Sequence, residues 1–349
     1  ADPVEDLRGY SGGVPMNLAN LAVIVPCYRC ADSLPRTVQS ILDNAPRDLR
    51  LVLVEDGSGD ETLSVSRRLS AGDSRIQVLP RPNGGAAAAR NTGLDAVPDA
   101  EWVMFVDSDD ELFPGLWQEL AAAPVPADYG MALFGFRTDS GFTSAGQLPA
   151  GGFSGLPALG AALSPLLFDL GLLASPCMKF YRRSVIGTLR FHEALKINED
   201  VLFNLQFLQS NSAMYFLQGC YYCQHDGQQG SLSRRLRGDL LQAEAITRPE
   251  LARLLRQNGI DPAPYVQTSR VRACLNQYSL LTGCRGSMPF AERRALFAEI
   301  LADADARAAL RDRLRCDPNR LLALPYRLGV ALRCPEFLAC YTMAKQRFL

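Results

Sequence analysis

An acidic motif, Asp107-Ser108-Asp109-Asp110, directly follows an apolar run at 102–106 that is typical of a buried strand. Ligand sites of α/β proteins lie beyond the carboxyl ends of such strands. Carboxylates two residues apart supply hard oxygen ligands that hold Mg²⁺ or Mn²⁺ and leave coordination positions open for substrate phosphates. Asp107 and Asp109 are therefore candidate metal ligands, whereas Asp110 is expected to cap the next helix. Taken alone, the motif is equally typical of an acidic turn after an edge strand.

The first 120 residues alternate between strand-like and helix-like segments. Buried strands are predicted at 21–26, 51–58 and 76–79, and helices are predicted between them, including an alanine-rich one at 85–94. This alternation predicts a parallel sheet with crossover helices. Because each strand ends in polar residues, one edge of the sheet is expected to be a polar crevice.

Several blocks of sequence occur in the order and spacing of a known enzyme family. They span residues 25–28, 55–62, 83–94, 105–110, 178–184 and 198–203. Together these blocks resemble the family 2 inverting glycosyltransferases, in particular bacterial polysaccharide-building members. The resemblance implies an α/β fold of the GT-A type, with a mixed, mainly parallel sheet flanked by helices and a helical C-terminal region.

The resemblance also implies an activity. The expected reaction moves a sugar from a UDP-sugar donor to a glycan or lipid-linked saccharide acceptor, with Mn²⁺ or Mg²⁺ as cofactor. Negative charge grows on the leaving diphosphate in such a transfer, and a metal ion held by carboxylates neutralises it. Arg29 and Ala31 stand where the family usually has asparagine and glutamate, so the identity of the nucleobase stays open.

Metal and donor roles follow from the same resemblance. Asp109 is the leading metal ligand, and Asp107 either assists it or hydrogen-bonds the ribose. A histidine near His225 completes the metal shell in some relatives, although a solvated loop histidine is the favoured interpretation of a lone imidazole. The predicted donor-binding residues are Pro26, Tyr28, Asp56, Gly84, Gly85, Arg90, Asp107 and Lys179.

Individual donor contacts can be stated as expectations. Tyr28 would lie against the base, and Asp56 would accept a hydrogen bond from a uracil N–H. Gly84 and Gly85 offer backbone N–H groups near a helix start, which suits phosphate, although a plain turn fits equally well. Arg90 would reach the diphosphate or the nucleobase, or else be a surface arginine.

Two further candidates lie after residue 170. Lys179 would counter phosphate charge or pair structurally with an acid. Asp200 is the predicted general base, because it precedes an amphipathic run at 201–208 and a helix start would point its side chain into the crevice. Without the resemblance, Asp200 reads more simply as a helix N-cap.

Two other function classes remain open. A nucleotidyltransferase shares the sheet and the metal carboxylates, but it needs a strongly basic triphosphate loop, and Asn83-Gly84-Gly85 has only Arg81 beside it. A non-catalytic module with a degenerate transferase fold would release no UDP from any donor. The acids at positions 107, 109 and 200 argue against that class.

The composition is that of a soluble enzyme. The chain has 349 residues, of which 48% are hydrophobic, and its net charge of −1 gives no reason to expect nucleic acid as a partner. No apolar run reaches the length of a membrane span. The pairs Cys27/Cys30 and Cys220/Cys223 have the spacing of zinc or redox sites, but the favoured interpretation is small buried residues in a reducing compartment.

Three segments are expected. Residues 1–15 would be a lead-in or a segment added for expression, 16–236 the GT-A catalytic domain, and 237–349 a helical region. The last of these is both apolar and basic toward its end. Its helices either pack on the domain with solvated arginines or make peripheral contact with an anionic membrane. The expected location is the cytoplasm, including the inner face of the membrane.

Overall fold

The computed structural model describes residues 20–171, 173–225, 236–283, 288–316 and 320–348. The chain divides into two compact units, unit 1 (Ala1–Asp226 and Arg253–Ile260) and unit 2 (Gly227–Ala252 and Asp261–Leu349). The segment boundaries drawn from the sequence stay a prediction.

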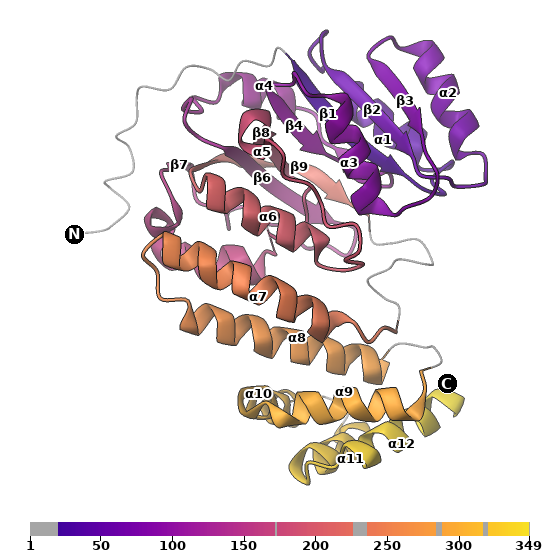
Figure 1. The fold of residues 1–349 in the computed structure, drawn as a ribbon, viewed down its shortest axis with the longest axis vertical. Helices are drawn as coiled ribbons and strands as arrows, with labels where there is room; N and C mark the ends of the chain where they lie inside the picture. Colours follow the sequence, from indigo (N-terminus) through magenta and orange to yellow (C-terminus); the bar gives the residue numbers. More distant parts are fainter. Residues whose placement is uncertain (1–19, 172, 226–235, 284–287, 317–319, 349) are drawn as a thin grey trace. The chain divides into compact units, whose positions relative to one another are not determined.

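Unit 1 begins with the predicted alternation of strands and helices. Four parallel strands lie in the order β3-β2-β1-β4 (Figure 1). They are β1 (Leu21–Cys27), β2 (Arg50–Glu55), β3 (Ile76–Pro80) and β4 (Trp102–Phe105), connected by α1 (Leu34–Leu42), α2 (Thr62–Gly72) and α3 (Ala86–Ala96). The central strands are apolar on both faces because helices cover both sides of a parallel sheet.

The second half of the sheet is mostly antiparallel. Its strands are β5 (Glu111–Leu112), β6 (Met131–Thr138), β7 (Gly151–Phe153), β8 (Lys179–Arg182) and β9 (Met214–Gln224). Strand β8 pairs antiparallel with both β4 and β6, β6 pairs parallel with β9, and β9 pairs antiparallel with β5 and β7. The mixed sheet confirms the expected fold class.

Short helices fill the connections of this second half. They are α4 (Leu116–Ala122), η2 (Leu156–Ala162), η3 (Pro165–Asp169), α5 (Arg183–Ile186) and α6 (Glu199–Ser210). Of these, α6 matters most for the site, because its first turn carries Glu199 and Asp200.

Aromatic packing fixes the start of α6 against the end of β4. Phe203 of α6 stacks on Phe191 with ring centroids 4.0 Å apart, and both rings contact the edge or face of Phe105 on β4. All three side chains are almost fully buried. Buried aromatic pairs add ~0.5–1.5 kcal/mol each beyond their area. The first turn of α6 is thereby held beside the carboxyl end of β4.

Helix α3 lies unusually close to β1. A Cβ atom at Gly93 would come within 2.4 Å of Ile24 Cγ2, so only glycine fits at this contact. The close approach places Arg90, one turn earlier on α3, near the carboxyl ends of the strands.

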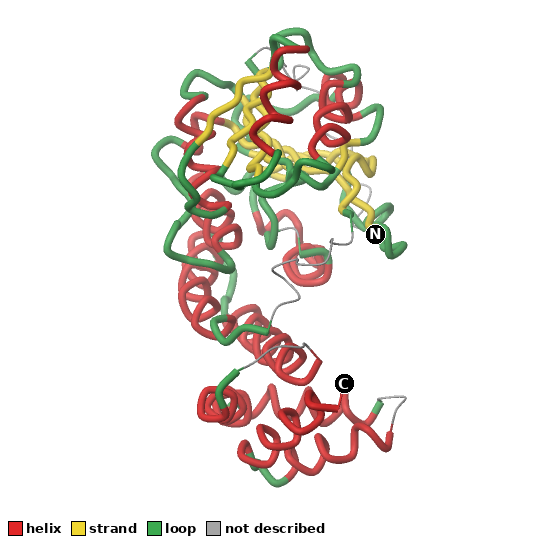
Figure 2. The backbone as a smooth tube through the Cα atoms, turned by 90° about the vertical axis from the view of Figure 1, so that its right-hand side faces the viewer, coloured by secondary structure: helices red, strands yellow, loops and turns green. Residues whose placement is uncertain are grey.

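Unit 2 is helical throughout its described residues (Figure 2). Its helices are α8 (Ala263–Gly283), α9 (Phe290–Ala302), α10 (Ala304–Arg315), α11 (Arg320–Ala331) and α12 (Pro335–Phe348), preceded by α7 (Leu240–Gln257), which the division between the units interrupts. Cys274, Phe297, Leu310, Val330 and Leu338 lie at its core. Within the described ranges, we found no helix with the length and hydropathy that a membrane crossing requires.

Candidate active site

A buried arginine connects the acidic motif to the start of α6. The Arg90 side chain is 5% exposed, and its Nη2 donates to Asp107 Oδ1 at 3.1 Å. Its Nη1 lies 3.7 Å from Glu199 Oε1. Burial would lower the pKa of Arg90, but Asp107, Asp200 and Glu199 more than offset this and raise it. Arg90 is therefore an interior cation that gathers carboxylates from two distant segments, not a surface arginine.

Asp200 is one of those carboxylates. Its side chain is half-buried in the first turn of α6, whose N-cap residue is Asn198, so Asp200 does not serve as a simple N-cap. Burial raises the pKa of Asp200 to about 7; Arg90 opposes the rise, and Glu199 and Asp107 add to it. A carboxylate that titrates near neutral pH suits general-base work. The structure thus brings together Asp200 and Asp107, which the sequence separates.

The acidic motif is held through its backbone. Ser108 O accepts hydrogen bonds from Ser33 Oγ at 2.9 Å and Thr37 Oγ1 at 3.0 Å, and Asp109 O accepts one from Arg36 Nη2 at 3.0 Å. Burial and the charge of Asp107 raise the pKa of Asp109, while His225 and Arg36 lower it. Two carboxylates that repel each other in this way fit a divalent cation, which would neutralise both.

Asp110 does not cap a helix as expected, since the N-cap residue of α4 is Gly115. Its carboxylate is 4% exposed and accepts hydrogen bonds from the Tyr222 hydroxyl at 2.7 Å and the His225 amide at 2.9 Å. Burial and the charge of Asp107 raise the pKa of Asp110 to about 8. Asp110 therefore attaches the motif to the end of β9. The sequence gives no local signal for this role or for Tyr222.

The turn after β3 differs from the expectation for a phosphate site. The amides of Gly84 and Gly85 donate to the Asp56 carboxylate, Gly85 at 2.7 Å, and Arg81 forms an ion pair with the same group. Asp56 is 2% exposed. The Asp56 carboxylate thus accepts hydrogen bonds from the N–H groups that were expected to bind phosphate. Both of its oxygens already have donors. The uracil contact predicted for Asp56 has no support in this arrangement.

The other predicted donor residues lie in contrasting environments. Tyr28 follows β1 and is 47% exposed, with the Arg29 guanidinium 5.2 Å from its ring centroid. Pro26 lies within β1 opposite Val54. Lys179 is fully buried, and its Nζ donates to Ser175 O and to Cys177 O. Burial lowers the pKa of Lys179 to about 7.

These environments separate the candidates. An exposed ring such as Tyr28 is available to a base, whereas the enclosed ammonium of Lys179 supports the structural interpretation. Its partners are carbonyls rather than the acid that was expected.

His225 lies just after β9, close to the acidic motif. Its Nδ1 is 2.9 Å from Asp139 Oδ2, and its Nε2 is 2.7 Å from Glu111 Oε1. Burial would lower its pKa, but the hydrogen bonds with Asp139 and Glu111 raise it overall. Both ring nitrogens therefore have carboxylate partners other than Asp107 and Asp109. His225 is thus not the solvated loop histidine that the sequence favoured.

Comparison with known proteins gives concordant results. Residues 22–190 match the family described as "Glycosyl transferase family 2". The chain is 26% identical over 234 residues to the uncharacterized glycosyltransferase YibD of Escherichia coli (strain K12), covering 63% of this chain and 66% of that protein. It is 28% identical over 222 residues to the poly(ribitol-phosphate) beta-N-acetylglucosaminyltransferase TarP of Staphylococcus aureus (strain N315), covering 58% and 62%. The chain thus spans just under two thirds of these relatives.

Solved structures support the fold. Staphylococcus aureus TarS 1–349 in complex with UDP-GlcNAc superposes with a TM-score of 0.60 at 18% identity, over 94% of this chain and 92% of that one. The mannosyltransferase PcManGT of Pyrobaculum calidifontis, in complex with GDP-Man and Mn²⁺, gives a TM-score of 0.54 at 18% identity over 96% and 89%. At such identities the likeness concerns the fold alone. The sequence match shows that residues 22–190 are similar to glycosyl transferase family 2.

Proposed function

We propose that this protein is an inverting, metal-dependent glycosyltransferase that moves one sugar from a UDP-sugar to a glycan or lipid-linked saccharide. The proposal depends chiefly on one observation: the buried guanidinium of Arg90 pairs with Asp107 after β4 and lies 3.7 Å from Glu199, the residue before Asp200 at the start of α6. Opposing carboxylates in one site are what a single displacement requires, one for the cation and one for the incoming hydroxyl.

In this proposal Asp109 and Asp107 hold the metal. The ion, Mn²⁺ or Mg²⁺, would supply Lewis-acid neutralisation of the diphosphate as it leaves. The hydrogen bonds to Ser108 O and Asp109 O hold the backbone of the motif in place, and Arg90 holds Asp107 Oδ1 at 3.1 Å. A site whose acids are positioned by their backbone costs little reorganisation when a cation binds. The proposed shell does not include His225, because its two ring nitrogens lie beside Asp139 and Glu111.

Asp200 would act as the general base. The acceptor hydroxyl oxygen attacks the anomeric carbon, the carbon–oxygen bond to the diphosphate breaks, and the hydroxyl proton passes to Asp200, with inversion at the carbon. A pKa of about 7 leaves much of Asp200 ionised at neutral pH while keeping it basic enough to take the proton. Arg90, paired with Asp107, would keep the ionised form accessible in a half-buried place.

The proposed donor contacts are revised by the geometry. The exposed ring of Tyr28 would stack on the nucleobase. The Asp56–Gly84–Gly85 cluster would shape the adjacent turn and make no direct phosphate contact. The alternative nucleotidyltransferase reaction loses its best anchor, because Arg81 is already paired with Asp56. The choice of UDP draws on TarS 1–349, whose structure contains UDP-GlcNAc.

The test is a donor screen that measures release of the nucleoside diphosphate. The metal-free protein is incubated with UDP-, GDP- and dTDP-sugars, with and without Mn²⁺, in the presence of saccharide acceptors. We expect UDP release that depends on Mn²⁺ and is stimulated by an acceptor. Turnover of GDP- or dTDP-sugars alone would remove the UDP assignment, and no turnover with any donor would favour the non-catalytic module.

Unit 2 carries a surface that fits an anionic membrane, and we propose peripheral contact there. Leu324 and Leu328 on α11, and Leu332 directly after it, are spaced four residues apart and are 46%, 48% and 74% exposed. Arg311, Arg315 and Arg327 line the same groove as Leu324 and Leu328. An apolar stripe beside arginines matches the headgroup region of an anionic bilayer.

Sedimentation with vesicles of anionic and of neutral lipid tests the membrane proposal. We expect binding to anionic vesicles alone, and a loss of about fivefold in partitioning for Arg327→Gln, since a basic residue near the surface contributes about 1 kcal/mol. Equal binding of Arg327→Gln and wild type, or equal binding to both lipids, would contradict it. Arg294→Gln, at an exposed position of α9, is the control because Arg294 is paired with Glu336.

A further inference from the structure

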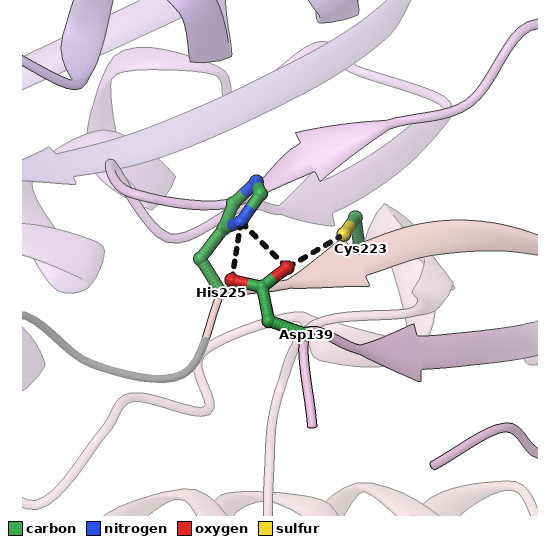
Figure 3. A group of neighbouring side chains, drawn as sticks. All are labelled: Asp139, Cys223 and His225. Atoms are coloured by element: carbon green, nitrogen blue, oxygen red, sulfur yellow. Dashed lines mark hydrogen bonds and ion pairs between the residues drawn. The ribbon is translucent and has the colours of Figure 1, made fainter. Parts of the chain in front are cut away.

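We infer that Asp139, Cys223 and His225 form a binding site for Zn²⁺ or a similar borderline divalent cation, separate from the Asp107/Asp109 site. The inference does not depend on the proposed function. One ligand atom from each residue lies within 4.8 Å of the other two. His225 Nδ1 is 2.9 Å from Asp139 Oδ2, and Cys223 Sγ is 4.0 Å from Asp139 Oδ1 (Figure 3).

The spacing suits a tetrahedral ion. Zinc bonds of about 2.0–2.3 Å place neighbouring ligand atoms roughly 3.3–3.8 Å apart. Measured to Asp139 Oδ1, the separations are 3.1 Å for His225 Nδ1 and 4.0 Å for Cys223 Sγ, which bracket that range, so small side-chain movements would close the shell. Cys223 is 7% exposed, whereas the Asp139 side chain is half exposed. Water could therefore take the fourth position on the open side.

The sheet itself brings the three residues together. Cys223 and His225 are two residues apart at the end of β9, where alternate side chains face the same side. Strand β6 runs parallel to β9 with Thr138 opposite Gln224, so Asp139 emerges next to His225. This grouping is set by backbone pairing and does not rely on a mobile surface contact.

The second nitrogen of His225 supplies an independent observation. Its Nε2 lies 2.7 Å from Glu111 Oε1, and Glu111 is itself paired with Arg36 at 2.9 Å. Histidines that bind metal through one nitrogen almost always donate the other N–H to a carboxylate, which fixes the tautomer and the ring orientation. His225 has this second partner on the side away from Cys223 and Asp139.

The ligand types decide which ion would bind. One imidazole, one thiolate and one carboxylate favour Zn²⁺ over Mg²⁺ or Mn²⁺, which prefer oxygen alone. The competing explanation is that His225 is simply protonated and lies between two carboxylates. In that case Cys223 would not bind a metal ion. An experiment that detects a bond between the metal and the Cys223 sulfur therefore distinguishes the two explanations.

The experiment uses Co²⁺ as a spectroscopic stand-in for zinc. The full chain is stripped of metal, titrated with Co²⁺ under reducing conditions, and monitored for a thiolate-to-cobalt charge-transfer band in the near ultraviolet. Zn²⁺ is then added, and a chromogenic chelator reports stoichiometry and affinity. We expect the band to develop to one equivalent of Co²⁺ and to disappear when Zn²⁺ displaces it.

Variants assign the site. Cys223→Ser should abolish the band and the zinc equivalent, whereas Cys220→Ser, three residues earlier on β9, should keep both. Glu111→Gln should weaken zinc binding by about 10–100-fold while keeping the band, as loss of an outer partner does. Asp139→Asn, at an exposed side chain, should lower affinity even if Cys223→Ser fails to fold. No band in the wild type, or unchanged affinity in Asp139→Asn, would overturn the inference.

Discussion

The carboxyl ends of two parallel strands carry acids in opposite conditions. After β2, Asp56 accepts hydrogen bonds from Gly84 and Gly85 and an ion pair from Arg81. After β4, Asp107 accepts a hydrogen bond from Arg90, and burial and the charge of Asp107 raise the pKa of Asp109. A satisfied carboxylate organises the fold around it, whereas crowded carboxylates gain from a cation. The proposed function accordingly assigns the reaction to the end of β4.

The largest expected difference between the two strand ends is in how transfer depends on the metal ion. Asp109→Asn removes one proposed metal ligand and one of the two negative charges that attract the cation, so transfer that depends on Mn²⁺ should fall by about 10²-fold or more, equivalent to ~3 kcal/mol. UDP release is measured against Mn²⁺ concentration. Asp56→Asn, which keeps an oxygen acceptor for the glycine amides, is the matched control and should keep the wild-type Mn²⁺ dependence. Equal losses in both variants would erase the distinction between the strands.

The next largest effect concerns the stability that Asp56, the acid after β2, gives to the fold. Asp56→Ala leaves the Gly84 and Gly85 amides and Arg81 without their buried acceptor, so the free energy of unfolding should fall by about 2–3 kcal/mol. Urea denaturation measures it. Asp99→Ala breaks an exposed ion pair with Arg50 and should leave the urea midpoint close to that of wild type. A loss at Asp56 no larger than at Asp99 would mean that the Asp56 cluster does not hold the turn.

A smaller effect concerns the pH dependence that Asp200, the proposed base, gives to the reaction. Because the base must be ionised and the pKa of Asp200 is about 7, the rate should rise with pH up to about 7 and then level off. Below that pH it should fall about tenfold per unit. The acidic limb of a pH–rate profile measures this slope and the pKa. Glu199→Gln should move the limb to lower pH, since Glu199 raises the pKa of Asp200. A limb that does not move would exclude this coupling.

Local patterns in the sequence were sufficient for most of the fold. Apolar runs such as 21–26 and 102–106 can only be strands buried on both faces, and the polar residues after them mark the crevice. The pairing of Asp107 with Asp200 was reached through the resemblance to a family. The electrostatic coupling of both carboxylates to Arg90 could not be read locally, because it depends on the close approach of α3 to β1.

Interactions between distant strands account for what the sequence missed. The capture of the Gly84 and Gly85 amides by Asp56 joins β2 to the turn after β3. The Tyr222 contact with Asp110 joins β9 to the acidic motif across a strand pairing that no sequence spacing indicates. In both cases a polar residue has two plausible uses, and only tertiary structure decides which partner comes within reach.

The placement of Asp200 opposite the metal acids is tested most directly by measuring transfer and donor binding on the same variant. For Asp200→Asn with Mn²⁺ present, the account predicts a rate of UDP release to the acceptor that is lower by ~10²–10⁴-fold. Calorimetric UDP affinity should stay within about threefold of wild type, because the base acts on the acceptor side. A variant that transfers at nearly the wild-type rate, or that loses donor binding in parallel with transfer, would contradict it.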